Sequence, residues 1–118
     1  MLYTNLKHIE SAAQYAQIIN ENQHVVVIYG SMGPMCIPVY RIAEEVEEEY
    51  KPIKFYDMEF DDPELTGIRT SPEFSNFSEI PYIIYFKNGI MVNSTSGLQT
   101  KTQITAFLDQ EFATTVKA

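Results

Sequence analysis

Residues 80–94 read Ile80-Pro-Tyr-Ile-Ile-Tyr-Phe-Lys-Asn-Gly-Ile-Met-Val-Asn-Ser94 and carry the strongest structural signal in the chain. The unbroken apolar and aromatic run Tyr82–Phe86 predicts a strand that is covered on both faces. Lys87-Asn-Gly89 has the composition of a tight hairpin turn, so we expect the strand Ile90–Ser94 to return antiparallel to the first. This part of the chain is therefore predicted to be a hairpin that begins at a proline.

The segments on either side of this hairpin alternate between helical and strand patterns. Helices are predicted where apolar residues recur every three to four positions, and strands where β-branched residues run together or alternate with polar ones. The predicted elements are a helix over Leu6–Ile19, a strand over Val25–Tyr29, a helix over Met35–Tyr50, a strand over Ile53–Phe60, short helices from Pro63 and over Pro72–Phe77, and a closing helix over Thr102–Phe112. This order indicates an α/β fold with a mixed central sheet of four to five strands, helices on both faces, and one domain over residues 1–118.

Charge and composition exclude several classes of partner. Eight basic and sixteen acidic residues give the 118-residue chain a net charge of −8, which would repel nucleic acid and anionic membrane surfaces. No apolar run approaches the ~20 residues of a membrane-spanning helix, and the first residues turn polar before a signal-peptide core could form. Cys36 is the only cysteine, which excludes an intramolecular disulfide and favours a reducing, cytoplasmic setting. We expect a monomer without a cofactor.

The sequence offers no pattern typical of a metal centre or of a common catalytic motif. His8 and His24 are far apart and have no cysteine or paired carboxylates next to them, so metal binding is not expected. The chain also lacks a Ser-His-Asp order, a phosphate-binding Walker loop and a dinucleotide glycine fingerprint.

The loop Gly30-Ser-Met-Gly-Pro34, with Cys36 at the predicted start of a helix, completes a pattern that resembles the thioredoxin family. The segment Pro81–Gly89 is similar to the family's cis-proline, apolar strand and Phe-Lys-Asn-Gly turn. Gly97, Phe107-Leu-Asp109 and Asp61-Asp-Pro63 also match the family pattern, and the segment between Asp61 and Pro81 is a few residues longer than usual. The resemblance covers nearly the whole chain. It implies the thioredoxin fold and a cis Ile80–Pro81 peptide bond.

The loop itself departs from the family, whose members carry Trp-Cys-Gly-Pro-Cys at this place. In the alignment that needs no gap, Cys36 takes the place of the second cysteine, Gly33 that of the first, nucleophilic cysteine, and Met32 that of the tryptophan. A second alignment matches Met32-Gly-Pro-Met35 to Cys-Gly-Pro-Cys and shifts the flanking segments by one residue. We favour the first, because it puts Cys36 on the inward face of the helix. Both alignments remove the attacking thiol.

Further departures concern the acid–base support of the thiols. Val27 aligns with a buried aspartate that assists proton transfer in the family, and Asp57 aligns with its lysine partner, so this support is expected to be absent or rearranged. Cys36 is interpreted as core packing, with a weak monothiol role, or an intermolecular disulfide or ligand role, as alternatives. Met32 and Met35 form either an adaptable apolar contact surface or part of the core.

The resemblance leaves one functional feature in place. The family's residue before the cis-proline, here Ile80, offers its backbone to an extended peptide, which is a form of β-strand addition. We therefore expect a protein without the redox dithiol that binds an extended segment of a partner protein. The expected contact residues are Met32, Gly33, Pro34, Met35, Ile80, Pro81, Ser96 and Gly97. The alternative is a thiol–disulfide oxidoreductase of the thioredoxin family with Cys36 as its catalytic residue.

Overall fold

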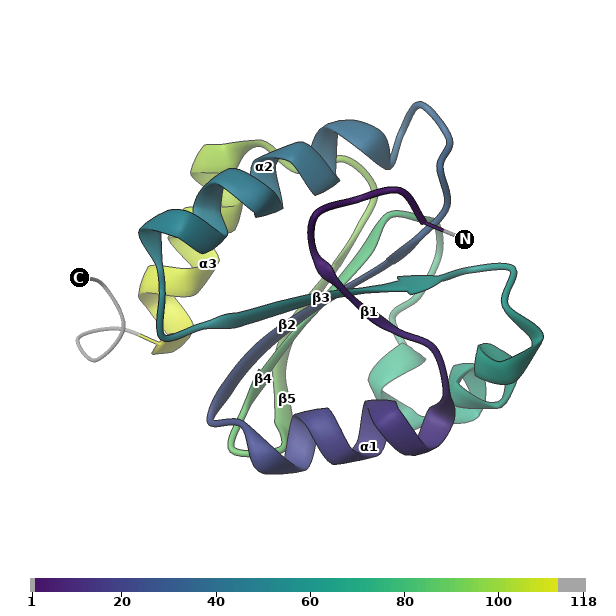
Figure 1. Cartoon of the computed structure of the whole chain (residues 1–118). Helices are drawn as coiled ribbons and strands as arrows, with labels where there is room; N and C mark the ends of the chain where they lie inside the picture. Colours follow the sequence, from purple (N-terminus) through teal and green to yellow (C-terminus); the bar gives the residue numbers. More distant parts are fainter. Residues whose placement is uncertain (1, 113–118) are drawn as a thin grey trace.

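Five strands form one mixed sheet in the order β1-β3-β2-β4-β5 in the computed structural model, which describes residues 2–112 (Figure 1). The strands are β1 (Lys7–Ile9), β2 (His24–Gly30), β3 (Lys54–Glu59), β4 (Tyr82–Lys87) and β5 (Ile90–Ser96). β1 and β2 run parallel to β3, whereas β4 is antiparallel to β2 and β5 to β4. The predicted mixed sheet and its closing hairpin are confirmed.

Helices cover both faces of this sheet. They are α1 (Ala12–Glu21), α2 (Ile37–Glu49) and α3 (Lys101–Phe112), with two 3-10 helices, η1 (Pro63–Thr70) and η2 (Pro72–Phe74). Figure 1 shows α2 and α3 on one face of the sheet and α1 on the other. The 3-10 helices pack on the α1 side, because Leu65, Ile68 and Phe74 belong to the buried cluster beneath α1.

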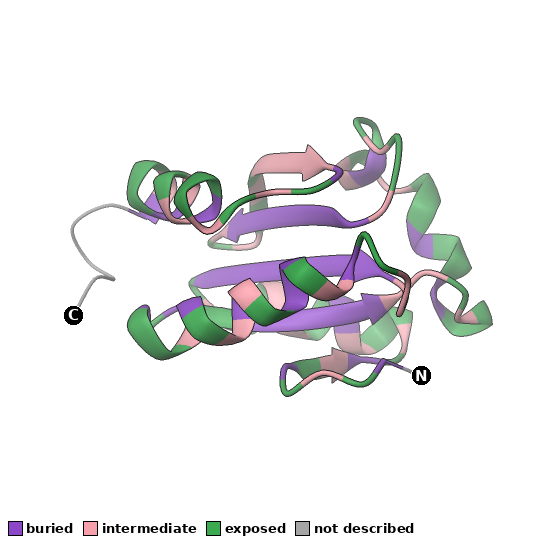
Figure 2. Ribbon diagram, turned by 90° about the horizontal axis from the view of Figure 1, so that it is seen from above, coloured by how far each residue is buried: buried purple, intermediate pink, exposed green. Residues whose placement is uncertain are grey.

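The central strands divide the core into two clusters. Successive side chains of a strand point to opposite faces of the sheet. Val26 and Ile28 therefore enter the cluster under α2 and α3, whereas Val25, Val27 and Tyr29 enter the cluster beneath α1. All seven residues of β2 are buried, and the central strands are the continuous buried band in Figure 2. A continuous apolar run is what a strand covered on both faces requires.

The predicted helix Leu6–Ile19 is wrong at its start. Residues 7–9 form β1, in which Ile9 pairs with Met58, and α1 begins only after Ser11, whose hydroxyl accepts the Gln14 N–H at 3.1 Å. Leu6 and Ile9 are three residues apart, which suits one face of a helix, but they pack into opposite clusters as strand residues do. A three-residue strand is too short to show its own alternation in the sequence.

Smaller differences concern the ends of several elements; the largest is the short helix predicted over Pro72–Phe77, which ends at Phe74. The predicted helix Met35–Tyr50 begins at Ile37 and ends at Glu49, which puts Pro38 in its first turn, where the missing proline N–H costs no hydrogen bond. The returning strand of the hairpin extends two residues beyond Ser94, to Ser96.

Candidate functional site

The loop of residues 31–36 joins β2 to α2 and folds as the beginning of the helix. The N–H groups of Cys36 and Ile37 both donate to the carbonyl oxygen of Gly33, at 3.1 and 3.2 Å. The Ser31 hydroxyl accepts the Gly33 N–H at 3.2 Å and holds the start of the loop. Residues 33 and 36 therefore lie one helical turn apart.

The Cys36 side chain points into the core. Its exposure is 1%, whereas that of Met35 is 45%. The Ser31 N–H donates to Cys36 Sγ at 3.5 Å, and the thiol belongs to the buried cluster under α2. This burial agrees with the alignment that gives Cys36 the inward cysteine position, because the alternative alignment would turn Met35 inward. No thiol is presented to solvent by the described loop.

Gly30 permits the close packing around this thiol. A Cβ at Gly30 would lie 2.6 Å from Tyr40 Oη and 2.9 Å from Cys36 Sγ, so a side chain has no room there. The Tyr40 hydroxyl is buried and has no hydrogen-bond partner among residues 2–112. Burial, and then the neighbouring Cys36, Asp57 and Glu59, raise the pKa of Tyr40, so its hydroxyl stays neutral.

The position assigned to Val27 needs a correction. A group that exchanges protons with Cys36 must lie on the α2 face of the sheet, but Val27 packs in the cluster on the α1 face. The residues of β2 that face the Cys36 cluster are Val26 and Ile28, and Ile28 pairs with Asp57 of β3. Val27 therefore does not lie where it could exchange protons with Cys36, and the two β2 residues on the Cys36 face are again aliphatic.

Asp57 is a buried carboxylate that sequence reasoning does not identify as a partner of His8. It is 1% exposed, accepts the Thr4 hydroxyl at 2.5 Å, and lies 2.6 Å from His8 Nδ1. Burial raises the pKa of Asp57, and the contacts with Thr4 and His8 oppose that rise. The pair escapes sequence reasoning because it depends on β1, in which His8 stands opposite Asp57.

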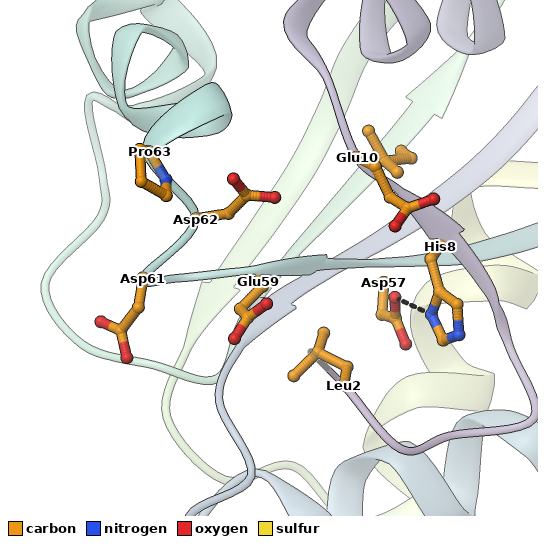
Figure 3. Close-up of a pocket in the computed structure, with 9 residues that line it drawn as sticks. Leu2, His8, Glu10, Asp57, Glu59, Asp61, Asp62 and Pro63 are labelled. Atoms are coloured by element: carbon orange, nitrogen blue, oxygen red, sulfur yellow. Dashed lines mark hydrogen bonds and ion pairs between the residues drawn. The ribbon is translucent and has the colours of Figure 1, made fainter.

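Asp57 and His8 belong to an acidic cavity of about 390 Å³ at the end of β1 and β3. The cavity is lined by Leu2, His8, Ile9, Glu10, Asp57, Glu59, Asp61, Asp62 and Pro63. In Figure 3 the Asp62 carboxylate points toward the side on which Glu10 lies, the Glu59 carboxylate points toward Leu2, and Asp61 points outward. Asp57 is paired with His8, and the exposed side of the cavity is made acidic by Glu10, Asp61 and Asp62.

A second cavity, of about 440 Å³, lies on the other side of the N-terminal segment. It is lined by Tyr3, Thr4, Asn5, Met32, Ile37, Tyr40, Arg41 and Glu44. The Tyr3 N–H contacts Met32 Sδ at 3.3 Å, so Met32 is partly covered by the N-terminal segment. Arg41 and Glu44 cancel in charge, and this cavity is not strongly acidic.

The expected partner-binding residues lie around the start of β4 and the end of β5. The Ile80–Pro81 peptide bond is cis, and the Gly97 N–H donates to the Pro81 carbonyl oxygen at 2.9 Å. Ser96 pairs with Tyr82, which brings residues 80, 81, 96 and 97 together. Met32 and Ile80 pack against the same buried cluster as Cys36. We call the set Met32, Gly33, Pro34, Met35, Ile80, Pro81, Ser96 and Gly97 the cis-proline surface.

Two other kinds of feature are absent from residues 2–112. No three His, Cys, Asp or Glu side chains in this range are placed to hold a metal ion together. No helix of the described part is long and apolar enough to cross a membrane.

Comparisons with known proteins give no sequence relative and a clear structural likeness. No family model and no curated protein matches the chain. Plasmodium falciparum thioredoxin is similar in structure, with 24% identity and a TM-score of 0.71 over 90% of this chain and 99% of that chain. Malassezia sympodialis thioredoxin has 18% identity and a TM-score of 0.74, covering 93% and 96% of the two chains.

The likeness extends to more distant thioredoxins. A mutant thioredoxin from Halobacterium salinarum has 13% identity and a TM-score of 0.76, covering 93% of this chain and 95% of that chain. Matches of nearly whole chains at such low identity establish the architecture. This chain therefore has the thioredoxin fold, and its single cysteine is buried at the start of α2.

Proposed function

We propose that this protein is a binding module that holds an extended segment of a partner protein on the cis-proline surface and performs no dithiol chemistry. The observation that carries the proposal is the state of Cys36, which is 1% exposed and has Gly33 one helical turn before it. Disulfide reduction needs an accessible thiolate to attack and a second thiol to resolve the mixed disulfide. This loop supplies neither, which argues equally against the alternative of a monothiol oxidoreductase.

The surface around the cis-proline supports the binding part of the proposal. Within residues 2–112 the backbone N–H and carbonyl of Ile80 have no hydrogen-bond partner, so they are open to an added strand. Met35 and Leu98 border this place with exposures of 45% and 50%, so they offer apolar contacts for alternate side chains of a bound segment. Methionine side chains adapt to differing partners because they are unbranched and flexible.

The net charge and the single cysteine support a proposal for the compartment, the oligomeric state and the partner class of this protein. A reducing compartment such as the cytoplasm suits a chain with one buried thiol. The net charge of −8 disfavours nucleic acid and anionic lipid surfaces, and it also opposes self-association, so we propose a monomer with a protein partner.

Titration of the ¹⁵N-labelled protein with a library of extended octapeptides tests the proposal. The expected result is that binding shifts the amide signals of Ile80 and Gly97, with the same dissociation constant in the parent protein and in the Cys36→Ala variant, with or without reductant. Binding that disappears in Cys36→Ala, while the variant keeps its folded spectrum, would overturn the proposal in favour of thiol chemistry. Peptide-induced signal shifts that are confined to residues outside the cis-proline surface would show that the peptide binds elsewhere.

A further inference from the structure

A carboxylate, that of Glu79, lies against Gly97 of the cis-proline surface. A Cβ at Gly97 would lie within contact of Glu79 Oε1 and 3.4 Å from Glu79 Cδ, so the Glu79 side chain lies directly over the α-carbon of Gly97. The Gly97 N–H donates a hydrogen bond to the Pro81 carbonyl oxygen. The Glu79 carboxylate therefore lies next to Gly97, whose neighbours Ile80 and Pro81 provide the backbone that an added strand would contact.

The geometry of the preceding loop fixes Glu79 in this place. The Ser78 N–H donates to the Ser96 hydroxyl at 3.2 Å, and that hydroxyl is 3.3 Å from the Asn76 carbonyl oxygen. These bonds tie residues 76–78 to the end of β5, next to Gly97. Since residue 78 is anchored by this bond and residue 80 by the core, the backbone of Glu79 between them has little freedom.

The charge of Glu79 is not neutralised within the described chain. In residues 2–112 its carboxylate makes neither a hydrogen bond nor an ion pair. The nearest lysine after Gly97 in sequence, Lys101, is bound to Glu45 and Glu49 at 2.7 Å each. A cation supplied by a partner would therefore find Glu79 available.

The acidic cavity adds negative charge near the start of the loop. Its Glu59 pairs with Gly30, and the Phe60 N–H donates to the Gly30 carbonyl oxygen at 2.7 Å, one residue before the loop begins. Arg69 also lies near this end of β3, but on the opposite face of the sheet. Its guanidinium stacks on the Phe60 ring at 4.1 Å and donates hydrogen bonds to the Tyr29 hydroxyl and the Phe60 carbonyl oxygen. The acidic cavity thus lies next to the start of the loop.

We propose that the segment held on the cis-proline surface is basic, with a lysine or arginine side chain placed against Glu79 and the acidic cavity attracting further positive charge. The inference rests on the proposed function and names the chemistry of its partner. Charge complementarity of this kind selects among partners and speeds their encounter more than it adds affinity. Because an exposed ion pair contributes little, the selection at Glu79 should be about threefold in affinity.

The test uses acetylated octapeptides of Leu, Val, Thr and Ser in which one position is varied as Lys, norleucine, Gln or Glu. Binding is followed by the shifts of the Ile80 and Gly97 amide signals. In the parent protein we expect Lys at one position to bind about threefold more tightly than norleucine, and the preference to shrink as salt is raised. Glu79→Gln should abolish that preference, and Glu79→Lys should reverse it toward Glu.

Glu48→Gln is the matched control, because it removes the same charge from the exposed pair with Lys51 near the far end of α2. It should leave the Lys preference unchanged. Peptides that shift Ile80 and Gly97 without any preference for Lys, or with a preference that survives in Glu79→Gln, would overturn the inference and leave the proposed function standing. If no peptide shifts these signals, the proposed function itself fails, and the inference fails with it.

Discussion

Cys36 shows how one buried atom organises the residues around it. The Cys36 sulfur and the Tyr40 hydroxyl occupy the space that a side chain at Gly30 would need. The Tyr40 hydroxyl has no hydrogen-bond partner among residues 2–112. A buried hydroxyl without a partner costs the free energy of its desolvation, so replacing it by an apolar group of the same shape is neutral or slightly stabilising. The glycine is required by space at this position.

Gly30→Ala is predicted to lower the free energy of unfolding by about 1–3 kcal/mol, the usual cost of overpacking a core. The cause is the added Cβ, which would lie 2.6 Å from Tyr40 Oη and 2.9 Å from Cys36 Sγ. Tyr40→Phe alone should be nearly neutral, and in the double variant it should recover part of the loss, because it removes the closest contact. Urea unfolding of the three variants measures this. A double variant no more stable than Gly30→Ala would show that the hydroxyl is not the obstacle.

His24 is predicted to make the folded state less stable in mild acid. It is 4% exposed, its Nε2 is buried without a partner among residues 2–112, and burial followed by the nearby Lys87 lowers its pKa below 6.5. The unfolded chain therefore binds the proton first as the pH falls through 6.5, and stability is lost on the acid side. Each pKa unit of lowering corresponds to about 1.4 kcal/mol.

The comparison that isolates this effect is thermal unfolding of the parent and of His24→Leu between about pH 7 and pH 5, the range in which a histidine titrates. The parent should lose more stability than the variant over this range. Asp57, whose pKa is raised from 3.8, changes stability in the opposite direction and is common to both proteins, so it cancels in the difference. If the stability of the two proteins falls equally between about pH 7 and pH 5, the acid sensitivity does not come from His24.

At the scale of elements, the turn that begins α2 sets the distance between residues 33 and 36. Gly33→Cys is predicted to form an intramolecular disulfide with Cys36, because the Cys36 N–H donates to the Gly33 carbonyl and residues one turn apart are neighbours. A Cβ at Gly33 meets only the Ser31 hydroxyl, at 3.3 Å, so the substitution fits with a small shift. After mild oxidation the variant should be a monomer without free thiols, and reduction should restore both.

Gly67→Cys is the control for this experiment, since a Cβ at Gly67 has nothing within 4 Å. Under the same oxidation it should keep two thiols or crosslink only between chains. If Gly33→Cys behaves like this control, the two positions are not neighbours, and Met32→Cys with Met35→Cys becomes the pair to examine.

The elements differ in how far the sequence reveals them. The long apolar runs of β2 and β4, and the Lys87-Asn-Gly89 turn, are local signals that predict their elements within one or two residues. β1 escapes prediction because its three residues pair only through a distant partner strand. The pair of His8 with Asp57 escapes it for the same reason. The face on which Val27 lies also escapes it, because an apolar run buried on both faces has no alternation that tells one face from the other.

At the scale of the whole molecule, the sheet and its helices place four structures at one end: the loop before α2, the cis-proline, the end of β5 and the acidic cavity (Figures 1 and 3). The structural likeness to thioredoxins covers at least 90% of this chain, although the sequence identity is only 13–24%. The chain therefore has the architecture of a thioredoxin with a loop that lacks the attacking thiol. We predict that such a molecule binds and does not reduce.

Reduction of insulin disulfides with dithiothreitol as electron source tests this claim most directly. We predict that the protein does not accelerate insulin precipitation above the rate with dithiothreitol alone, because Gly33 supplies no sulfur and Cys36 is 1% exposed. Turnover comparable with that of an ordinary thioredoxin, abolished by Cys36→Ala, would show that the buried thiol reaches its substrate and would contradict the account.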